Sequence, residues 1–183
     1  MHEDQTVLET ATGASLHVTS AARDHLKAHP TVWDVLGEAV AQVTLPELDN
    51  VCAFEIDLGR PLARATLLPA PPIDLDMPAS FAVRVNREHP SRVTEETATT
   101  WDSTVVVWVR RSDAAAPFEL ATAFIGRLGP LEPWDPHLKS QADFQVALDF
   151  WCRHALVHDG QVMQPVFTSS WGEILREAQS PFL

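Results

Sequence analysis

The sequence predicts an α+β domain in which two helices precede an antiparallel meander of about five strands and further helices follow. Three observations predict it: apolar residues at helical spacing near the amino terminus, a central series of short β-branched segments, and renewed helical spacing in the last third. With 183 residues, of which 45% are hydrophobic, the chain can bury a sizeable core within the length of one domain. We therefore expect a single domain over 1–183.

The first helical pair is expected between Ser20 and Leu45. Ser20 is a favoured capping residue for a short helix that continues to Lys27, and Pro30 stands where the first turn of a second helix tolerates proline. The pair Leu45-Pro46 then ends the helical pattern. The apolar residues that follow Pro30 at helical spacing are Val32, Val35, Leu36, Ala39, Val40 and Val43.

Strands are expected in the middle of the chain, because short β-branched or aromatic segments there are bounded by Gly, Pro or Asp. Too few residues separate these segments for parallel crossovers, which indicates an antiparallel sheet. The segment 104–109 is apolar on both faces and is the expected central strand. The expected strands are 51–58, 63–68, 81–85, 104–109 and 118–124.

The last third is expected to be helical after a stiff connection. The segment 126–136 contains three X-Pro pairs, so it can continue neither a helix nor a central strand. Beyond it, Phe144, Leu148 and Trp151 recur at helical spacing, which predicts a long helix over 138–156 and a short final helix over 171–178.

Composition limits the classes of function. A net charge of -12 argues against a protein that wraps around nucleic acid, because phosphate binding depends on Lys and Arg. Between Arg60 and Arg127, however, eight arginines balance eight acids.

Cys52 and Cys152 are expected to be free thiols, since two cysteines make no disulfide framework. No apolar run is long enough for a membrane helix and the first residues are acidic, so we expect a cytoplasmic protein without a membrane partner.

Two histidine pairs are candidates for chemistry. His25 and His29 are four residues apart and would share a helical face, where they could exchange protons or hold a metal. No further ligand lies at a standard spacing, so we expect no metal centre there. An exposed histidine and a helix-terminal one explain the pair equally well. His154 and His158 are expected at the end of the long helix.

The segment 86–92 and one threonine complete the candidates. Arg87, His89 and Arg92 place two guanidiniums and an imidazole within a short loop, a composition that could bind a phosphate and move a proton. Ordinary solvated loop residues would have the same composition. Thr122 falls on an expected core strand, where its hydroxyl must find a partner or line a cavity.

The order of these features resembles the metal-independent nucleases of the barnase, EndoU, colicin E5/D and RelE type, especially their phage- and toxin-associated branches. The resemblance covers 19–126: the segment His25-Leu26-Lys27-Ala28-His29-Pro30, the helix that follows, and a meander in which 104–109 leads to Leu120-Ala121-Thr122-Ala123-Phe124. It implies an enzyme that transfers phosphate to an RNA 2′-hydroxyl without a metal or other cofactor. His25 or His29 would then move protons, Arg87 and Arg92 would hold the phosphate, and Thr122 would orient the substrate.

Two other functions stay open at this point. An acidic chain also suits a non-enzymatic immunity- or antitoxin-like protein that masks a basic partner, because opposite charge speeds the encounter of two proteins. A phage or mobile-element protein that keeps such a fold without activity is the third hypothesis. A fold by itself does not choose among these functions.

Overall fold

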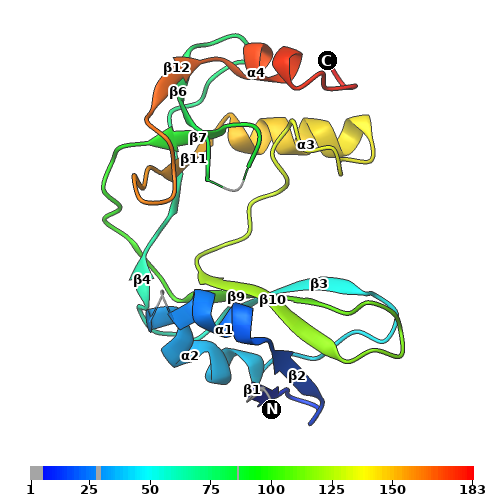
Figure 1. The fold of residues 1–183 in the computed structure, drawn as a ribbon. Coiled ribbons are helices and arrows are strands. Elements are labelled where there is room, and N and C mark those ends of the chain that lie inside the picture. Colours follow the sequence, from blue (N-terminus) through cyan, green and yellow to red (C-terminus); the bar gives the residue numbers. More distant parts are fainter. Residues whose placement is uncertain (1–5, 28–29, 86) are drawn as a thin grey trace. The chain divides into compact units, whose positions relative to one another are not determined.

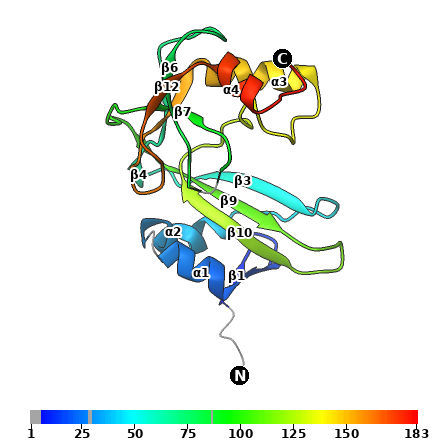
Figure 2. The ribbon, with the colours of Figure 1, turned by 45° about the horizontal axis from the view of Figure 1, so that its top comes forward.

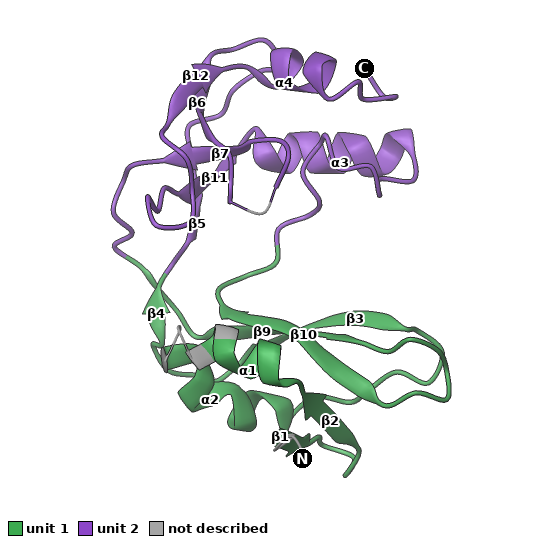
Figure 3. Cartoon of the chain, viewed as in Figure 1, with its two compact units in different colours: residues 1–64, 100–128 green, residues 65–99, 129–183 purple. Residues whose placement is uncertain are grey.

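The computed structural model describes residues 6–27, 30–85 and 87–183. The chain forms two compact units (Figures 1 and 3). Unit 1 comprises Met1–Arg64 and Thr100–Leu128, and unit 2 comprises Ala65–Thr99 and Gly129–Leu183. Each unit therefore joins two stretches that are distant in sequence. That the whole of 1–183 acts as one domain stays a prediction.

Unit 1 is built on a mixed five-stranded sheet in the order β1-β2-β10-β9-β3. Neighbouring strands are antiparallel except β2 and β10, which are parallel. Strand β9 lies inside the sheet between β10 and β3, as its apolar sequence predicts. The bounds are β1 Thr6–Glu9, β2 Ser15–Val18, β3 Val51–Asp57, β9 Thr104–Arg110 and β10 Phe118–Ile125, and a separate two-stranded sheet pairs β4 Ala63–Arg64 with β8 Trp101–Asp102.

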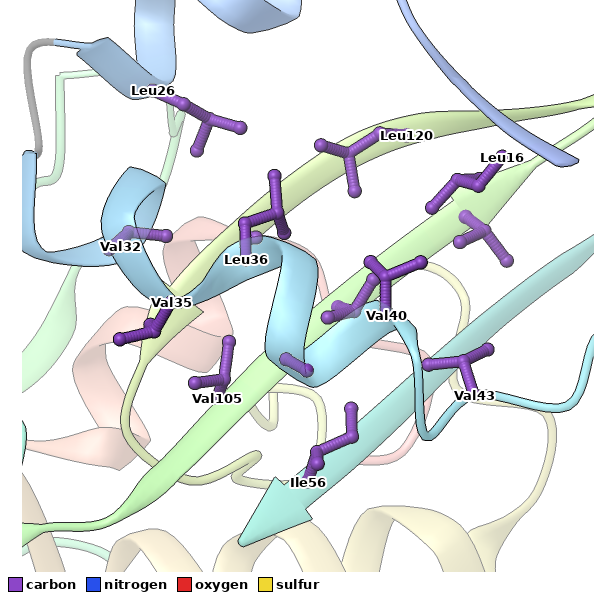
Figure 4. Packing of buried hydrophobic residues seen from close by; sticks show 14 of the residues in the cluster. Leu16, Leu26, Val32, Val35, Leu36, Val40, Val43, Ile56, Val105 and Leu120 are labelled. Carbon is purple, nitrogen blue, oxygen red and sulfur yellow. The ribbon is translucent and has the colours of Figure 1, made fainter. Parts of the chain in front are cut away.

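Helices α1 (Ser20–Lys27) and α2 (Pro30–Val40) pack against this sheet and close the core of unit 1 (Figures 2 and 4). The α2 side chains of Leu36 and Val40 are almost fully buried together with Val105 of β9. The first helix is capped by Thr19, whose hydroxyl accepts a hydrogen bond from the Ala22 amide at 3.2 Å, and not by the neighbouring serine.

Unit 2 contains a second mixed five-stranded sheet in the order β12-β6-β7-β11-β5, in which β7 and β11 are parallel. Its core packs Trp171 edge-on against Phe81, with ring centroids 5.0 Å apart. Ser140 and Ser170 cap the two helices of the unit. The bounds are β5 Leu67–Pro69, β6 Ala79–Ala82, β7 Ser91–Thr94, α3 Gln141–Trp151, β11 His154–Val157, β12 Phe167–Ser169 and α4 Trp171–Glu177.

The predicted fold class is wrong, although several of its elements are confirmed. The described chain begins with a β-hairpin rather than a helix, its strands form three sheets rather than one meander, and two further strands lie in the last third. The parallel pairs β2–β10 and β7–β11 join segments far apart in sequence, which the spacing of adjacent segments cannot reveal. The confirmed elements are α1, α2, α4, β3, β9 and β10.

The long helix predicted over 138–156 is the clearest local correction. Helix α3 ends at Trp151, and the residues from His154 onward form β11 between β7 and β5. Pairing with two neighbouring strands outweighs the helical spacing of the apolar residues, because it satisfies the backbone groups on both sides of the segment. Among the described residues, no helix is long and apolar enough to cross a membrane.

Arg92 of β7 is a structural residue of unit 2. Its side chain is buried, and its guanidinium donates hydrogen bonds to the carbonyls of Cys152 at 2.8 Å, Trp151 at 3.4 Å and Pro71 at 2.7 Å. Two of these carbonyls lie at the end of α3, where the helix dipole favours a cation. Burial lowers the pKa of Arg92 from the usual arginine value. The guanidinium thus joins β7 to the end of α3 and to the chain near Pro71.

We expect Arg92→Ala to lower the free energy of unfolding of unit 2 by about 3 kcal/mol, because it leaves three carbonyls without their charged donor. Arg87→Ala is the matched control, since that side chain is exposed and a surface substitution changes stability by about 0.5 kcal/mol or less. Urea denaturation followed by circular dichroism measures both. Equal effects of the two substitutions would contradict the structural role of Arg92.

The two cysteines are free thiols, and we expect both to react slowly in the folded protein. Burial raises the pKa of Cys152, and burial followed by the nearby Asp49 carboxylate raises the pKa of Cys52. A raised pKa leaves less thiolate at pH 8, and the thiolate is the reactive form. Labelling with a chromogenic disulfide should therefore be slow in buffer and fast in denaturant. Labelling of Cys152 at the same rate in both conditions would refute this.

Candidate functional site

In unit 2, the segment 129–137 is fastened to the residues around the start of β7. The indole nitrogen of Trp134 donates a hydrogen bond to the Pro90 carbonyl at 2.7 Å. The hydroxyl of Ser91 donates to the Glu132 carboxylate at 2.8 Å, and the Arg84 guanidinium donates to the same oxygen. Glu132 is 5% exposed, so these bonds satisfy a buried charge. The connection expected to be stiff is therefore also anchored.

Asp135 and His137 form a carboxylate–imidazole pair at the end of this segment. The ring nitrogen Nδ1 of His137 lies 2.9 Å from Oδ1 of Asp135, which also accepts the backbone N–H of His137 at 2.9 Å. An ionised carboxylate only accepts hydrogen bonds, so Nδ1 carries the hydrogen and Nε2 keeps its lone pair in the neutral ring. The carboxylate side chain is 4% exposed and the imidazole 83% exposed. A buried acid thus orients a solvent-accessible base.

A second imidazole lies beside the residue that precedes Asp135. The ring centroid of His89 is 5.4 Å from that of Trp134, with the two planes tilted by 57°. His89 is half-buried, whereas Arg87 of the same segment is exposed. The residues 87–90 and 134–137 therefore supply two imidazoles and one accessible guanidinium. We call these two segments the histidine site.

The histidine site has the parts of a proton-transfer centre. Histidine can accept and donate a proton, and a carboxylate hydrogen-bonded to Nδ1 fixes the ring tautomer. A second imidazole can return a proton, and an exposed guanidinium can bind a phosphate or carboxylate. No group of three or more His, Cys, Asp or Glu side chains in the described residues could hold a metal ion.

Arg87 and His137 of the histidine site are exposed to solvent. Two surface hollows of about 460 and 450 Å³ lie elsewhere, one between β12 and α4 and the other at the turn between β9 and β10. We place the chemistry at the histidine site because its groups are oriented by a buried acid, whereas neither hollow is lined by a histidine.

The residues that the sequence suggested for catalysis belong to both units. His29 lies outside the described residues, and His25 belongs to α1 with a side chain that is not described. Thr122 is half-buried on β10 of unit 1, opposite Trp108 of β9. Arg87 and His89 belong to unit 2 and share one segment. Arg92 also belongs to unit 2, but its guanidinium is buried against backbone carbonyls.

His154 and His158 do not form the helical pair that was predicted, because α3 ends before them. The ring of His154 stacks on Phe150 with centroids 4.0 Å apart, and its Nδ1 lies 2.9 Å from the Phe150 carbonyl. His158 lies 3.0 Å through Nε2 from the Gln164 carbonyl. Each ring has a separate local contact, so His158 serves as a control histidine.

Sequence reasoning missed Asp135 and His137, because the run of prolines marked 126–136 only as a connection. A usable signal was present in Leu131-Glu132-Pro133-Trp134-Asp135-Pro136-His137, where two acids alternate with apolar residues and a histidine follows the second acid by two positions. Acids in such surroundings are candidates for burial, and a buried acid needs a hydrogen-bond partner.

Comparison of the chain with protein-family models, curated proteins and solved structures finds no match.

Proposed function

We propose that the chain is a metal-independent ribonuclease whose proton-transfer group is His137, oriented by Asp135. The observation that carries the proposal is the bond between a buried carboxylate and the Nδ1 atom of an exposed imidazole. RNA contains its own nucleophile, the 2′-hydroxyl, so its cleavage needs only a base, an acid and a cation near the phosphate. His137, His89 and Arg87 are groups of these three kinds.

The proposed reaction begins when Nε2 of neutral His137 withdraws the proton of the 2′-hydroxyl. The 2′-oxygen forms a bond to phosphorus while the bond from phosphorus to the 5′-oxygen breaks. His89 in its protonated form donates a proton to the departing 5′-oxygen, and Arg87 stabilises the charge on the phosphate oxygens. The products are a 2′,3′-cyclic phosphate and a 5′-hydroxyl. Asp135 touches no substrate and acts by orienting His137.

His25 and His29 are the competing proton-transfer pair, because the nuclease resemblance assigns the roles to them and Thr122 would then orient the substrate. His25 belongs to unit 1 and His137 to unit 2, so the two versions of the proposal differ in the unit that supplies the proton-transfer group. Substitutions in one unit therefore test each version without disturbing the residues of the other.

We expect His137→Ala to lower the rate of RNA cleavage in EDTA by about a hundredfold, the typical contribution of a positioned acid or base. Asp135→Asn should lower kcat while leaving KM nearly unchanged, because it removes the partner that fixes the ring tautomer. His158→Ala is the matched control and should cleave at the wild-type rate. Gel analysis of a labelled oligonucleotide measures the rates and identifies the cyclic phosphate.

Two outcomes would overturn this assignment. If the double substitution of His25 and His29 by Ala abolishes cleavage while His137→Ala preserves it, the helical histidines are the proton-transfer pair. If the wild-type protein leaves single-stranded, duplex and structured RNA intact, the ribonuclease proposal is wrong.

A further inference from the structure

A surface groove of about 460 Å³ is lined by β12 and α4 in unit 2. Strand β12 forms one wall with its whole length, and one face of α4 forms the other. The lining residues are Phe167, Thr168, Ser169, Glu173, Arg176 and Glu177. None of them belongs to the histidine site, so binding at this groove can be tested independently of RNA cleavage.

The strand wall is a sheet edge. Within residues 65–85, 87–99 and 129–183, β12 pairs with β6 on one side and has no strand on the other. A free edge presents backbone N–H and C=O groups to which an extended peptide can add as another strand. Pro165 precedes β12, and the strand has three residues, so the edge accommodates a short segment and not a long one.

The groove is held in a fixed shape. The hydroxyl of Ser169 donates a hydrogen bond to Oε2 of Glu173 at 2.9 Å, and the capping box of Ser170 and Glu173 ties the first turn of α4 to the end of β12. Phe167 is 42% exposed, and its ring lies 6.5 Å from that of buried Phe81. A rigid groove with an exposed aromatic ring loses little conformational entropy when a segment binds.

The charge of the groove indicates the chemistry of the bound segment. Glu173 and Glu177 stand one turn apart on the same face of α4, and Asp76 approaches Arg176 to 3.9 Å. The groove is therefore lined by two carboxylates and by one guanidinium that Asp76 pairs from outside the lining, within a unit that has twelve acidic and six basic side chains. We propose that this groove binds a short, extended segment of a partner protein that carries Lys or Arg beside an apolar residue.

A synthetic pentapeptide of alternating Lys and Val, acetylated and amidated at its ends, tests the proposal by fluorescence anisotropy. We expect Glu177→Lys to weaken its binding by about tenfold, because the substitution reverses a charge at the groove. Glu95→Lys, an equal charge change at an exposed site of unit 2 outside the groove, is the control and should bind like the wild type. Phe167→Ser should also weaken binding by removing the apolar contact.

Strand addition gives a second readout, because only alternate amides of the added peptide face the edge. Methylation of one alternate set of peptide amides should abolish binding, and methylation of the other set should leave it unchanged. The proposal is wrong if the peptide does not bind, if both methylated peptides bind like the parent, or if Glu95→Lys and Glu177→Lys weaken binding equally.

Discussion

The buried Glu132 carboxylate is the group on which the arrangement of the histidine site depends. It accepts hydrogen bonds from Ser91 and Arg84 at one oxygen, and these bonds join the proline-rich segment to the chain around β7. A buried carboxylate is tolerated only when hydrogen-bond donors satisfy it. The donors Ser91 and Arg84 therefore hold the two segments together. Trp134 adds a hydrogen bond to the Pro90 carbonyl, and Asp135 follows it directly in the chain. The position of the Asp135–His137 pair therefore follows from the hydrogen bonds that the buried Glu132 carboxylate requires.

Burial also explains why arginines of one short stretch have different roles. Arg84 neutralises an acid, Arg87 is exposed, and Arg92 is enclosed by three carbonyls at the end of α3 and near Pro71. Composition alone treats Arg87 and Arg92 as a pair that could hold a phosphate. In the structure the N–H groups of Arg92 are engaged by carbonyls of its own unit, whereas the side chain of Arg87 stays accessible. Substitution of Arg92 should therefore change the stability of unit 2, whereas substitution of Arg87 should change the rate of RNA cleavage.

Much of the local structure could be predicted from the sequence, but the sheets could not. Apolar spacing predicts α2, and the doubly apolar segment around Val106 predicts an internal strand, because burial of a helix stripe or of both strand faces leaves a local pattern. Strands such as β1 and β12 have three or four residues, and β2 and β7 have parallel partners far away in the sequence. The site escaped prediction for a related reason: Trp134 joins the segment of Asp135 to that of His89 through its contacts with the His89 ring and the Pro90 carbonyl, which no local spacing encodes.

The charge of -12 bears differently on the two proposals for unit 2. An acidic protein repels RNA, so charge opposes substrate association without altering the local chemistry of His137, and added salt screens the repulsion. Raising ionic strength from low to moderate should therefore lower KM for RNA while kcat stays nearly constant. Binding of the Lys-Val peptide to the groove gains from opposite charges, so the same salt should weaken it. Steady-state kinetics and anisotropy at several salt concentrations measure the two trends, and a shared direction would contradict the electrostatic basis of one of the proposals.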